Sequence, residues 1–131
     1  MRLQLVTPDR QVLDAEIDEV YAPGVRGQFG ILPEHVNFLT ALDVGELRYR
    51  SGGRDRWVAV AGGVAEVLGE DVTILADNAA PAEEIDIAAL RAETSEIEAA
   101  LSGVEPGTPE ADDLGSRLAW IQACEAVAAR A

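Results

Sequence analysis

The five residues Asp77-Asn78-Ala79-Ala80-Pro81 divide the sequence into two parts of different composition. Asp, Asn and Pro favour turns and interrupt regular structure. Residues 1–80 hold most of the glycines and β-branched residues, whereas residues 81–131 hold thirteen alanines. We therefore expect a β-rich domain over residues 1–80 and a helical domain over residues 81–131.

On the N-terminal side of this boundary, short runs of β-type residues alternate with turn signals. Gly62-Gly63 and Gly69-Glu70-Asp71 separate neighbouring runs, and glycine reaches the φ angles of tight turns without a steric clash. Many short strands at this spacing are typical of an antiparallel sandwich or barrel. The strands expected are Leu3–Thr7, Val12–Ile17, Glu19–Ala22, Gly45–Arg50, Trp57–Ala61, Val64–Leu68 and Val72–Ala76.

On the C-terminal side, two helical patterns follow each other. Apolar residues three and four apart from Ile87 to Leu101 predict a helix over about residues 86–102, with Asp86 as the N-cap and Gly103 as the stop. A second helix is expected over about residues 109–130. Thr108 is its expected N-cap, followed by Pro109 in the first helical position and an apolar face through Leu114, Leu118, Ile121 and Val127.

The short link between the two helices predicts an antiparallel hairpin. Alanine allows close packing but buries little apolar area, so the hydrophobic stabilisation of this hairpin should be small. The sequence therefore indicates a hairpin that can detach from the rest of the chain.

The charge excludes some classes of partner. Ten arginines, no lysine and 24 acidic residues give a formal net charge of −14. Binding to nucleic acid or to an anionic lipid surface requires clustered cations, so neither is expected. No segment approaches the roughly 20 apolar residues that cross a bilayer, and Met1–Leu5 leads into an alternating strand. We expect a protein of the cytoplasm.

Side chains for catalysis are scarce. The one histidine, His35, lies in a turn-like segment without a nucleophile motif, and the one cysteine, Cys124, has no metal ligands at a suitable spacing. The lysine of a phosphate-binding P-loop is absent. A carboxylate pair for acid/base hydrolysis stays an open alternative, although 24 acids produce some close pairs by chance. We expect no enzyme activity of the chain by itself, no metal and no cofactor.

Three stretches resemble the epsilon subunit of F-type, proton-translocating ATP synthases. They are Leu5-Val6-Thr7-Pro8-Asp9-Arg10, then Ala22-Pro23-Gly24-Val25-Arg26-Gly27-Gln28-Phe29-Gly30-Ile31-Leu32-Pro33-Glu34-His35, and Val60-Ala61-Gly62-Gly63-Val64-Ala65-Glu66-Val67. The resemblance implies a sandwich of about ten strands followed by a helical hairpin. It also implies a non-catalytic subunit of the central rotor that binds the gamma subunit and the membrane ring of c subunits. Such a subunit couples proton translocation to rotary ATP synthesis, peripheral to the cytoplasmic face of a bacterial cell membrane.

The resemblance also implies where partners bind. The glycines of residues 24–30 would let a loop lie close to a partner backbone, or they only make turns. From the residues alone, a turn or packing role is favoured for His35 over a catalytic one. The candidate partner contacts are Gly27, Phe29, Gly30, Ile31, Leu32, Pro33, His35 and Leu42.

In many members of that family the hairpin can extend and inhibit ATP hydrolysis by contacting an acidic segment of the beta subunits. Here residues 81–131 hold three arginines among eleven acids, so attraction to an acidic partner is poor and weak inhibition is expected. Some bacterial members bind ATP through an Asp-x-x-Arg-Ala motif. In this sequence Asp86 and Arg91 are five residues apart, about 140° around a helix, so the motif is broken. A free ATP-sensing module remains the alternative function.

Overall fold

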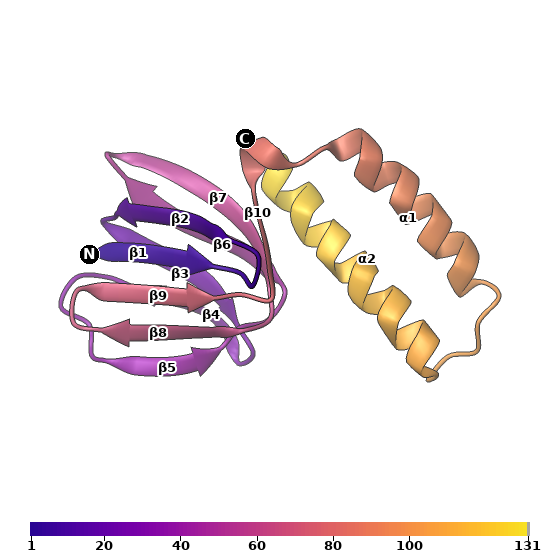
Figure 1. The fold of residues 1–131 in the computed structure, drawn as a ribbon, viewed down its shortest axis with the longest axis horizontal. Helices are drawn as coiled ribbons and strands as arrows, with labels where there is room; N and C mark the ends of the chain where they lie inside the picture. Colours follow the sequence, from indigo (N-terminus) through magenta and orange to yellow (C-terminus); the bar gives the residue numbers. More distant parts are fainter. Residues whose placement is uncertain (131) are drawn as a thin grey trace.

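The computed structural model describes residues 1–130 as ten strands, one short 3-10 helix and two α-helices (Figure 1). The strands form one body and the α-helices form a second, smaller one beside it. The strands are β1 (Arg2–Val6), β2 (Gln11–Glu16), β3 (Glu19–Gly24), β4 (Gly27–Ile31), β5 (Phe38–Ala41), β6 (Gly45–Ser51), β7 (Arg54–Ala61), β8 (Val64–Leu68), β9 (Asp71–Leu75) and β10 (Asn78–Pro81), and the helices are η1 (Ala82–Glu84), α1 (Ile87–Leu101) and α2 (Pro109–Ala128).

The ten strands make two five-stranded sheets that pack as a sandwich. Sheet A has the order β2-β1-β9-β8-β5 and faces the viewer in Figure 1, and sheet B has the order β10-β7-β6-β3-β4 behind it. The expected sandwich is confirmed, but it is not wholly antiparallel, because β1 and β9 pair in parallel, with Leu3 opposite Val72. A parallel pair requires a crossover, and here the intervening chain enters sheet B twice, as β3–β4 and as β6–β7, with β5 of sheet A between them.

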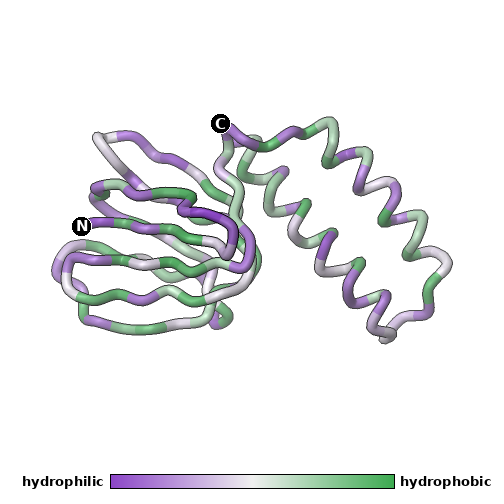
Figure 2. Tube along the Cα trace, viewed as in Figure 1, coloured by the Kyte–Doolittle hydropathy of each residue, from purple (hydrophilic) through white to green (hydrophobic). Residues whose placement is uncertain are grey.

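Alternation along the strands builds the sandwich core. Leu3 and Leu5 of β1, and Val72 and Ile74 of β9, point inward and are essentially inaccessible, while their neighbours along each strand face outward. The same alternation is visible along the strands in Figure 2. Large aliphatic side chains from both sheets therefore fill the interior between them.

Three strands lie where the sequence predicted turns or no regular structure. β4 contains Gly27 and Gly30, and Pro33 lies in the segment before β5. Glycine and proline are depleted in strands, so the composition did not indicate a strand at either place. β10 occupies Asn78–Pro81, inside the expected interdomain turn, where it pairs with β7 at the edge of sheet B. An edge strand tolerates Pro81 because it has one side without a ladder partner. The turn assignment for residues 78–81 is therefore wrong.

The hairpin between β6 and β7 is tighter than expected. Its strands extend to Ser51 and Arg54, which leaves only Gly52 and Gly53 in the turn. Their φ angles are +59° and +77°, as a type I′ turn requires at both positions. Glycine is needed here because other residues are strained at such angles.

The helical hairpin begins with the caps that the sequence predicted. The Asp86 carboxylate accepts a hydrogen bond from the Ala89 amide at 3.2 Å, and the Thr108 hydroxyl accepts one from the Ala111 amide at 3.2 Å. Along the facing sides of α1 and α2 the chain buries Ile97 and Ile121.

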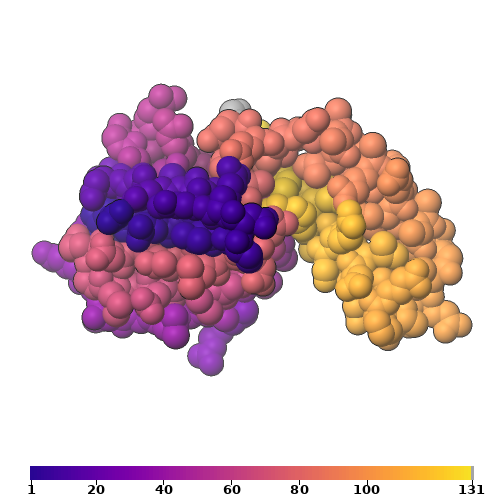
Figure 3. Space-filling model, in the orientation of Figure 1, coloured from indigo at the N-terminus to yellow at the C-terminus, as the bar shows by residue number. Residues whose placement is uncertain are grey.

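Only one end of the hairpin rests on the sandwich. Ala123, Cys124 and Val127, near the C-terminal end of α2, are buried with Ala59 of β7. Farther toward the start of α2 the two bodies separate, and Figure 3 shows the resulting hollow between them. A cavity of about 370 Å3 lies on this side, lined in part by Asp77 and Ser116. The fully buried part of the docking contact is thus small, and larger residues such as Trp57 and Trp120 are only half-buried around it.

Candidate partner-binding surface

The outer face of sheet A carries an apolar row. Strand pairing places Ala41, Val64, Leu75 and Val6 side by side across β5, β8, β9 and β1. All four alternate with inward residues, and Leu75 is 50% exposed. Such a row on a solvent-facing sheet is typical of a surface that a partner covers.

The segment between β4 and β5 extends this surface. Leu32 and Val36 of this segment and Leu39 of β5 are exposed, and Val36 and Leu39 are the most exposed large apolar residues, at 79% and 66%. Glu34 has a φ of +69° in this segment, which turns the chain sharply between the two sheets. We name the exposed large apolar residues of this segment, of sheet A and of the turn between β3 and β4 the sandwich patch. It comprises Val25, Leu32, Val36, Leu39, Leu68 and Leu75.

The glycines of the predicted contact block have structural roles. Gly27 has a φ of +116° at the end of the turn between β3 and β4. Gly30 lies beneath the ring of Tyr21, its cross-strand partner, and a Cβ there would stand 2.6 Å from a ring carbon. Glycine is therefore required at position 30 because a Cβ there would collide with the Tyr21 ring, and at position 27 because of the turn.

The other predicted contacts divide between core and surface. Ile31 and Leu42 are buried in the sandwich, at 0% and 4% exposure, so their side chains are not available to a partner. Inward alternation on β4 accounts for Ile31, and Leu42 forms a bridge with Gly24. Phe29 is half-buried and meets Phe38 edge to face, with ring centroids 5.8 Å apart.

Leu32, Pro33 and His35 do lie at the surface of the segment between β4 and β5. Leu32 and Pro33 are exposed, and His35 is half-buried. The Nδ1 atom of His35 is 3.0 Å from the carbonyl oxygen of Val36, so one ring nitrogen is engaged by the backbone. These three residues are accessible, as are the predicted contacts Gly27 and Gly30.

The predicted nucleotide residues are not brought together. Asp86 caps α1 and lines a cavity of about 210 Å3 between the hairpin and the sandwich. Arg91 is exposed on α1 and does not line this cavity. The walls of the cavity are largely apolar, and they include Ala80, Ile85, Leu90, Trp120 and Cys124. Within the described chain, nothing here supplies a cation for a triphosphate.

Ion pairs on the surface link distant elements. Arg10, in the turn after β1, pairs with Glu84 of η1, and the hydrogen bond from Arg10 holds the pKa of that carboxyl below its ordinary value. Arg2 lowers the pKa of Asp14 in the same way within sheet A. Burial raises the pKa of the Cys124 thiol to about 11.

Residues 1–130 meet neither the requirements of a metal site nor those of a membrane-spanning helix. No group of three or more His, Cys, Asp or Glu side chains is placed to hold a metal ion. None of the helices described is both long and apolar enough to span a bilayer.

The sequence predictions missed most of the sandwich patch. Val25, Val36, Leu39, Leu68 and Leu75 were not among the candidates, although a signal exists for three of them. Outward positions of their strands, where a polar residue is expected, are occupied by Leu39, Leu68 and Leu75. An apolar residue in the outward phase of a strand is therefore the pattern that identifies this surface.

Comparisons with known proteins agree with this architecture. The family described as "ATP synthase, Delta/Epsilon chain, beta-sandwich domain" matches residues 1–82. A protein of Nitratidesulfovibrio vulgaris strain Miyazaki F, named "ATP synthase epsilon chain", is 52% identical over 87 residues, which are 66% of this chain and 65% of the relative. The chain thus spans a little under two thirds of that relative's length.

A relative of the same name from Syntrophobacter fumaroxidans is 49% identical over 102 residues, covering 78% of this chain and 76% of the relative.

Two solved structures share the fold. A chain in the cryo-EM structure of Euglena gracilis mitochondrial ATP synthase, OSCP/F1/c-ring, superposes with a TM-score of 0.78 and 26% identity, covering 95% of this chain and 78% of the other. A chain of the Tetrahymena thermophila enzyme matches at a TM-score of 0.60 and 17% identity over 98% and 96%, a likeness of fold alone. The family match over the sandwich and the identities near 50% lead to one conclusion: the chain belongs to the family of ATP synthase delta and epsilon chains.

Proposed function

We propose that this chain is a non-catalytic subunit of the central stalk of an F-type ATP synthase, in which it couples proton translocation to rotary ATP synthesis. The sandwich binds the gamma subunit and the c-subunit ring, and the complex holds the chain at the cytoplasmic face of a bacterial cell membrane. Membership of the family supports this role, as do relatives named "ATP synthase epsilon chain" and a similar chain within an F1/c-ring assembly.

The observation that carries the proposal is the sandwich patch. A single sandwich with one core moves as a rigid unit, so a torque applied to one surface is transmitted to another. The patch gives that unit an apolar contact surface, and apolar burial is the main favourable term in stable association. We therefore place partner binding at the sandwich, residues 1–80, with Leu32, Pro33 and His35 at its margin.

The hairpin, residues 81–131, is proposed to inhibit ATP hydrolysis only weakly. Two of its three arginines are already paired with carboxylates of this chain, Arg117 with Glu93 of α1 and Arg130 with Glu46 of β6. Attraction to an acidic segment of a beta subunit would compete with these pairs. Deleting residues 87–131, which leaves β10 intact, should raise ATP hydrolysis by the complex only slightly, and a large rise would contradict this.

A second candidate, ATP sensing at the junction of sandwich and hairpin, has one supporting observation. Asp86 lines a cavity there, although Arg91 does not. Calorimetry with ATP on the isolated chain tests it, and we expect no heat of binding.

Capture from membranes tests the rotor role. A tagged chain should capture a gamma-like protein and ring subunits from solubilised membranes of its own cell. Leu39→Glu and Leu75→Glu place a charge in the sandwich patch and should abolish this capture. Gln122→Glu adds the same charge at an exposed position of α2 and should leave it intact. Failure of the unaltered chain to capture a gamma-like protein would overturn the rotor role, and capture by both patch variants would overturn the contact surface.

A further inference from the structure

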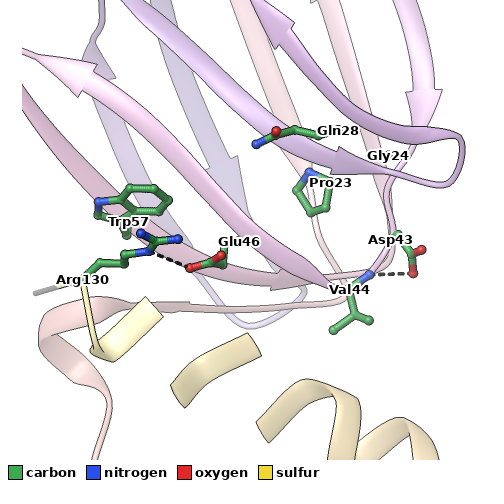
Figure 4. A pocket seen from close by; sticks show the side chains of 8 residues that line it. All are labelled: Pro23, Gly24, Gln28, Asp43, Val44, Glu46, Trp57 and Arg130. Carbon is green, nitrogen blue, oxygen red and sulfur yellow. Dashed lines mark hydrogen bonds and ion pairs between the residues drawn. The ribbon is translucent and has the colours of Figure 1, made fainter. Parts of the chain in front are cut away.

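The end of the hairpin is fixed to sheet B by one arginine. The guanidinium carbon of Arg130 lies 4.5 Å from the centroid of the Trp57 ring, and its Nε donates a hydrogen bond to the Glu46 carboxylate at 3.3 Å. Figure 4 shows the three side chains together at the edge of an open pocket of about 380 Å3. A flat aromatic face beside a carboxylate is the arrangement that binds a guanidinium group.

The pair that receives Arg130 is itself held in place by the sheet. Trp57 lies opposite Arg48, and Arg48 lies opposite Tyr21, so the three side chains form a row on the outer face of sheet B. The Arg48 guanidinium is 4.5 Å from the Tyr21 ring and 5.9 Å from the Trp57 ring, and it pairs with Asp55. Trp57 is therefore a packed, preorganised surface before Arg130 arrives.

Little else fixes the hairpin at this end. The fully buried part of the remaining contact is Ala123, Cys124 and Val127 against Ala59, and half-buried residues that include Trp120 of α2 and Val44 of the sandwich pack around it. Between residues 109–130 and the sandwich, Arg130 to Glu46 is the one side-chain hydrogen bond that the structure records. A contact with so little apolar area depends strongly on any specific interaction added to it.

We propose that Trp57 and Glu46 form a guanidinium-binding site on the sandwich, that Arg130 of the same chain is its ligand, and that this occupancy holds the hairpin in its docked position. When the hairpin leaves, the site becomes vacant and presents an aromatic face and a carboxylate to solvent. All residues of this site belong to one chain, so the proposal can be tested on the isolated protein. Its outcome does not depend on whether the chain acts in a rotor.

Cys124 provides a natural reporter of docking. It is the one cysteine of the chain, it is 3% exposed, and it lies in the contact between α2 and the sandwich. A thiol reagent can reach it only after the contact opens. When the contact recloses faster than the reagent reacts, the rate of labelling under native conditions is proportional to the open population.

The test compares labelling rates of the full chain. Arg130→Ala should raise the rate by about three- to tenfold, from the loss of one cation–π contact and one exposed ion pair. Arg130→Lys, which keeps the charge but not the planar group, should fall between wild type and Arg130→Ala. The matched control is Arg2→Ala, which removes an arginine–carboxylate pair from sheet A and should leave the rate unchanged.

Two results overturn the proposal. The first is an unchanged rate in Arg130→Ala. The second is additivity of Arg130→Ala with Trp57→Leu, because residues that act through one contact must give non-additive effects. Circular dichroism distinguishes release of the hairpin from fraying of the end of α2, because release leaves the helical signal unchanged. A loss of helicity in Arg130→Ala that accounts for the faster labelling would also overturn it.

Discussion

The sandwich core and the contact between sandwich and hairpin differ in what they bury. The core is filled with large aliphatic side chains such as Leu5, Leu47 and Ile74, and none of these is measurably exposed. The hairpin contact fully buries Ala123, Cys124 and Val127 against Ala59, while its larger side chains, such as Trp57 and Trp120, stay half-buried. Buried apolar area sets the strength of both, so the chain places strong packing where it stays folded and weak packing where it can separate. Four predictions test this difference, from the largest expected effect to the smallest.

The largest effect is expected from Leu47→Ala, which tests how tightly the sandwich core is packed. Leu47 is completely buried in β6, and removing its side chain leaves a cavity in the sandwich core. The free energy of unfolding should fall by about 2–5 kcal/mol. Urea denaturation followed by circular dichroism measures it. A fall well below 2 kcal/mol would mean that the core can relax around the cavity and that its packing is not tight.

Gly30→Ala tests how rigidly the side chains on the outer face of sheet B are packed. The new Cβ would stand 2.6 Å from a ring carbon of Tyr21, so the ring and the Arg48 group stacked on it must move. We expect a cost of about 1–3 kcal/mol in unfolding free energy. The variant Gly30→Ala with Tyr21→Ala is the control, because without the ring the added methyl group should cost much less.

Val127→Ala weakens the hairpin contact alone. Val127 is fully buried against the sandwich, and losing its two methyl groups should cost about 1–2 kcal/mol of docking free energy. Cys124 should become faster to label, while the thermal midpoint of the sandwich stays that of wild type. A parallel fall of that midpoint would show that hairpin and sandwich unfold as one unit, and the comparison would fail.

The smallest effect on stability is expected from the ion pair of Arg10 and Glu84, and acid should remove it. The pKa of Glu84 is lowered in the folded chain by the hydrogen bond from Arg10, so the pair stabilises the fold above the ordinary glutamate pKa of about 4.3. This stabilisation is lost as pH falls below that value through the lowered pKa. Thermal melts of wild type and Glu84→Gln should differ slightly at pH 7 and converge toward pH 3. A difference that stays constant with pH would exclude an electrostatic origin.

Local sequence patterns predicted many of the elements. Elements and contacts that depend on residues far apart in the sequence were missed. The alternation of β1 and β9 and the caps Asp86 and Thr108 are local patterns, and they identified the sandwich and the hairpin. β10 could not be found in this way, because pairing with β7 outweighs the turn preference of its residues. Arg130 and Glu46 are 84 positions apart, so no local pattern reveals their contact.

The candidate surface was predicted only in part, for a physical reason of its own. The resemblance located the segment around Leu32 and His35, but it could not show that Ile31 and Leu42 point into the core. Direction depends on the phase of each strand, and the phase of β4 was hidden by its glycines. Gly30 stays a predicted partner contact, and the packing of the Tyr21 ring beside it is a separate reason for glycine that the sequence did not reveal.

The parallel pairing of β1 with β9 has a consequence for synthesis of the chain. β1 is a central strand of sheet A, yet one of its two neighbours is completed only at Leu75. At 5–20 residues per second a ribosome takes roughly 4–14 s to make the intervening chain, far longer than a hairpin needs to form. The nascent N-terminal strand must therefore wait with one edge open, and sheet A is complete only when β9 leaves the exit tunnel.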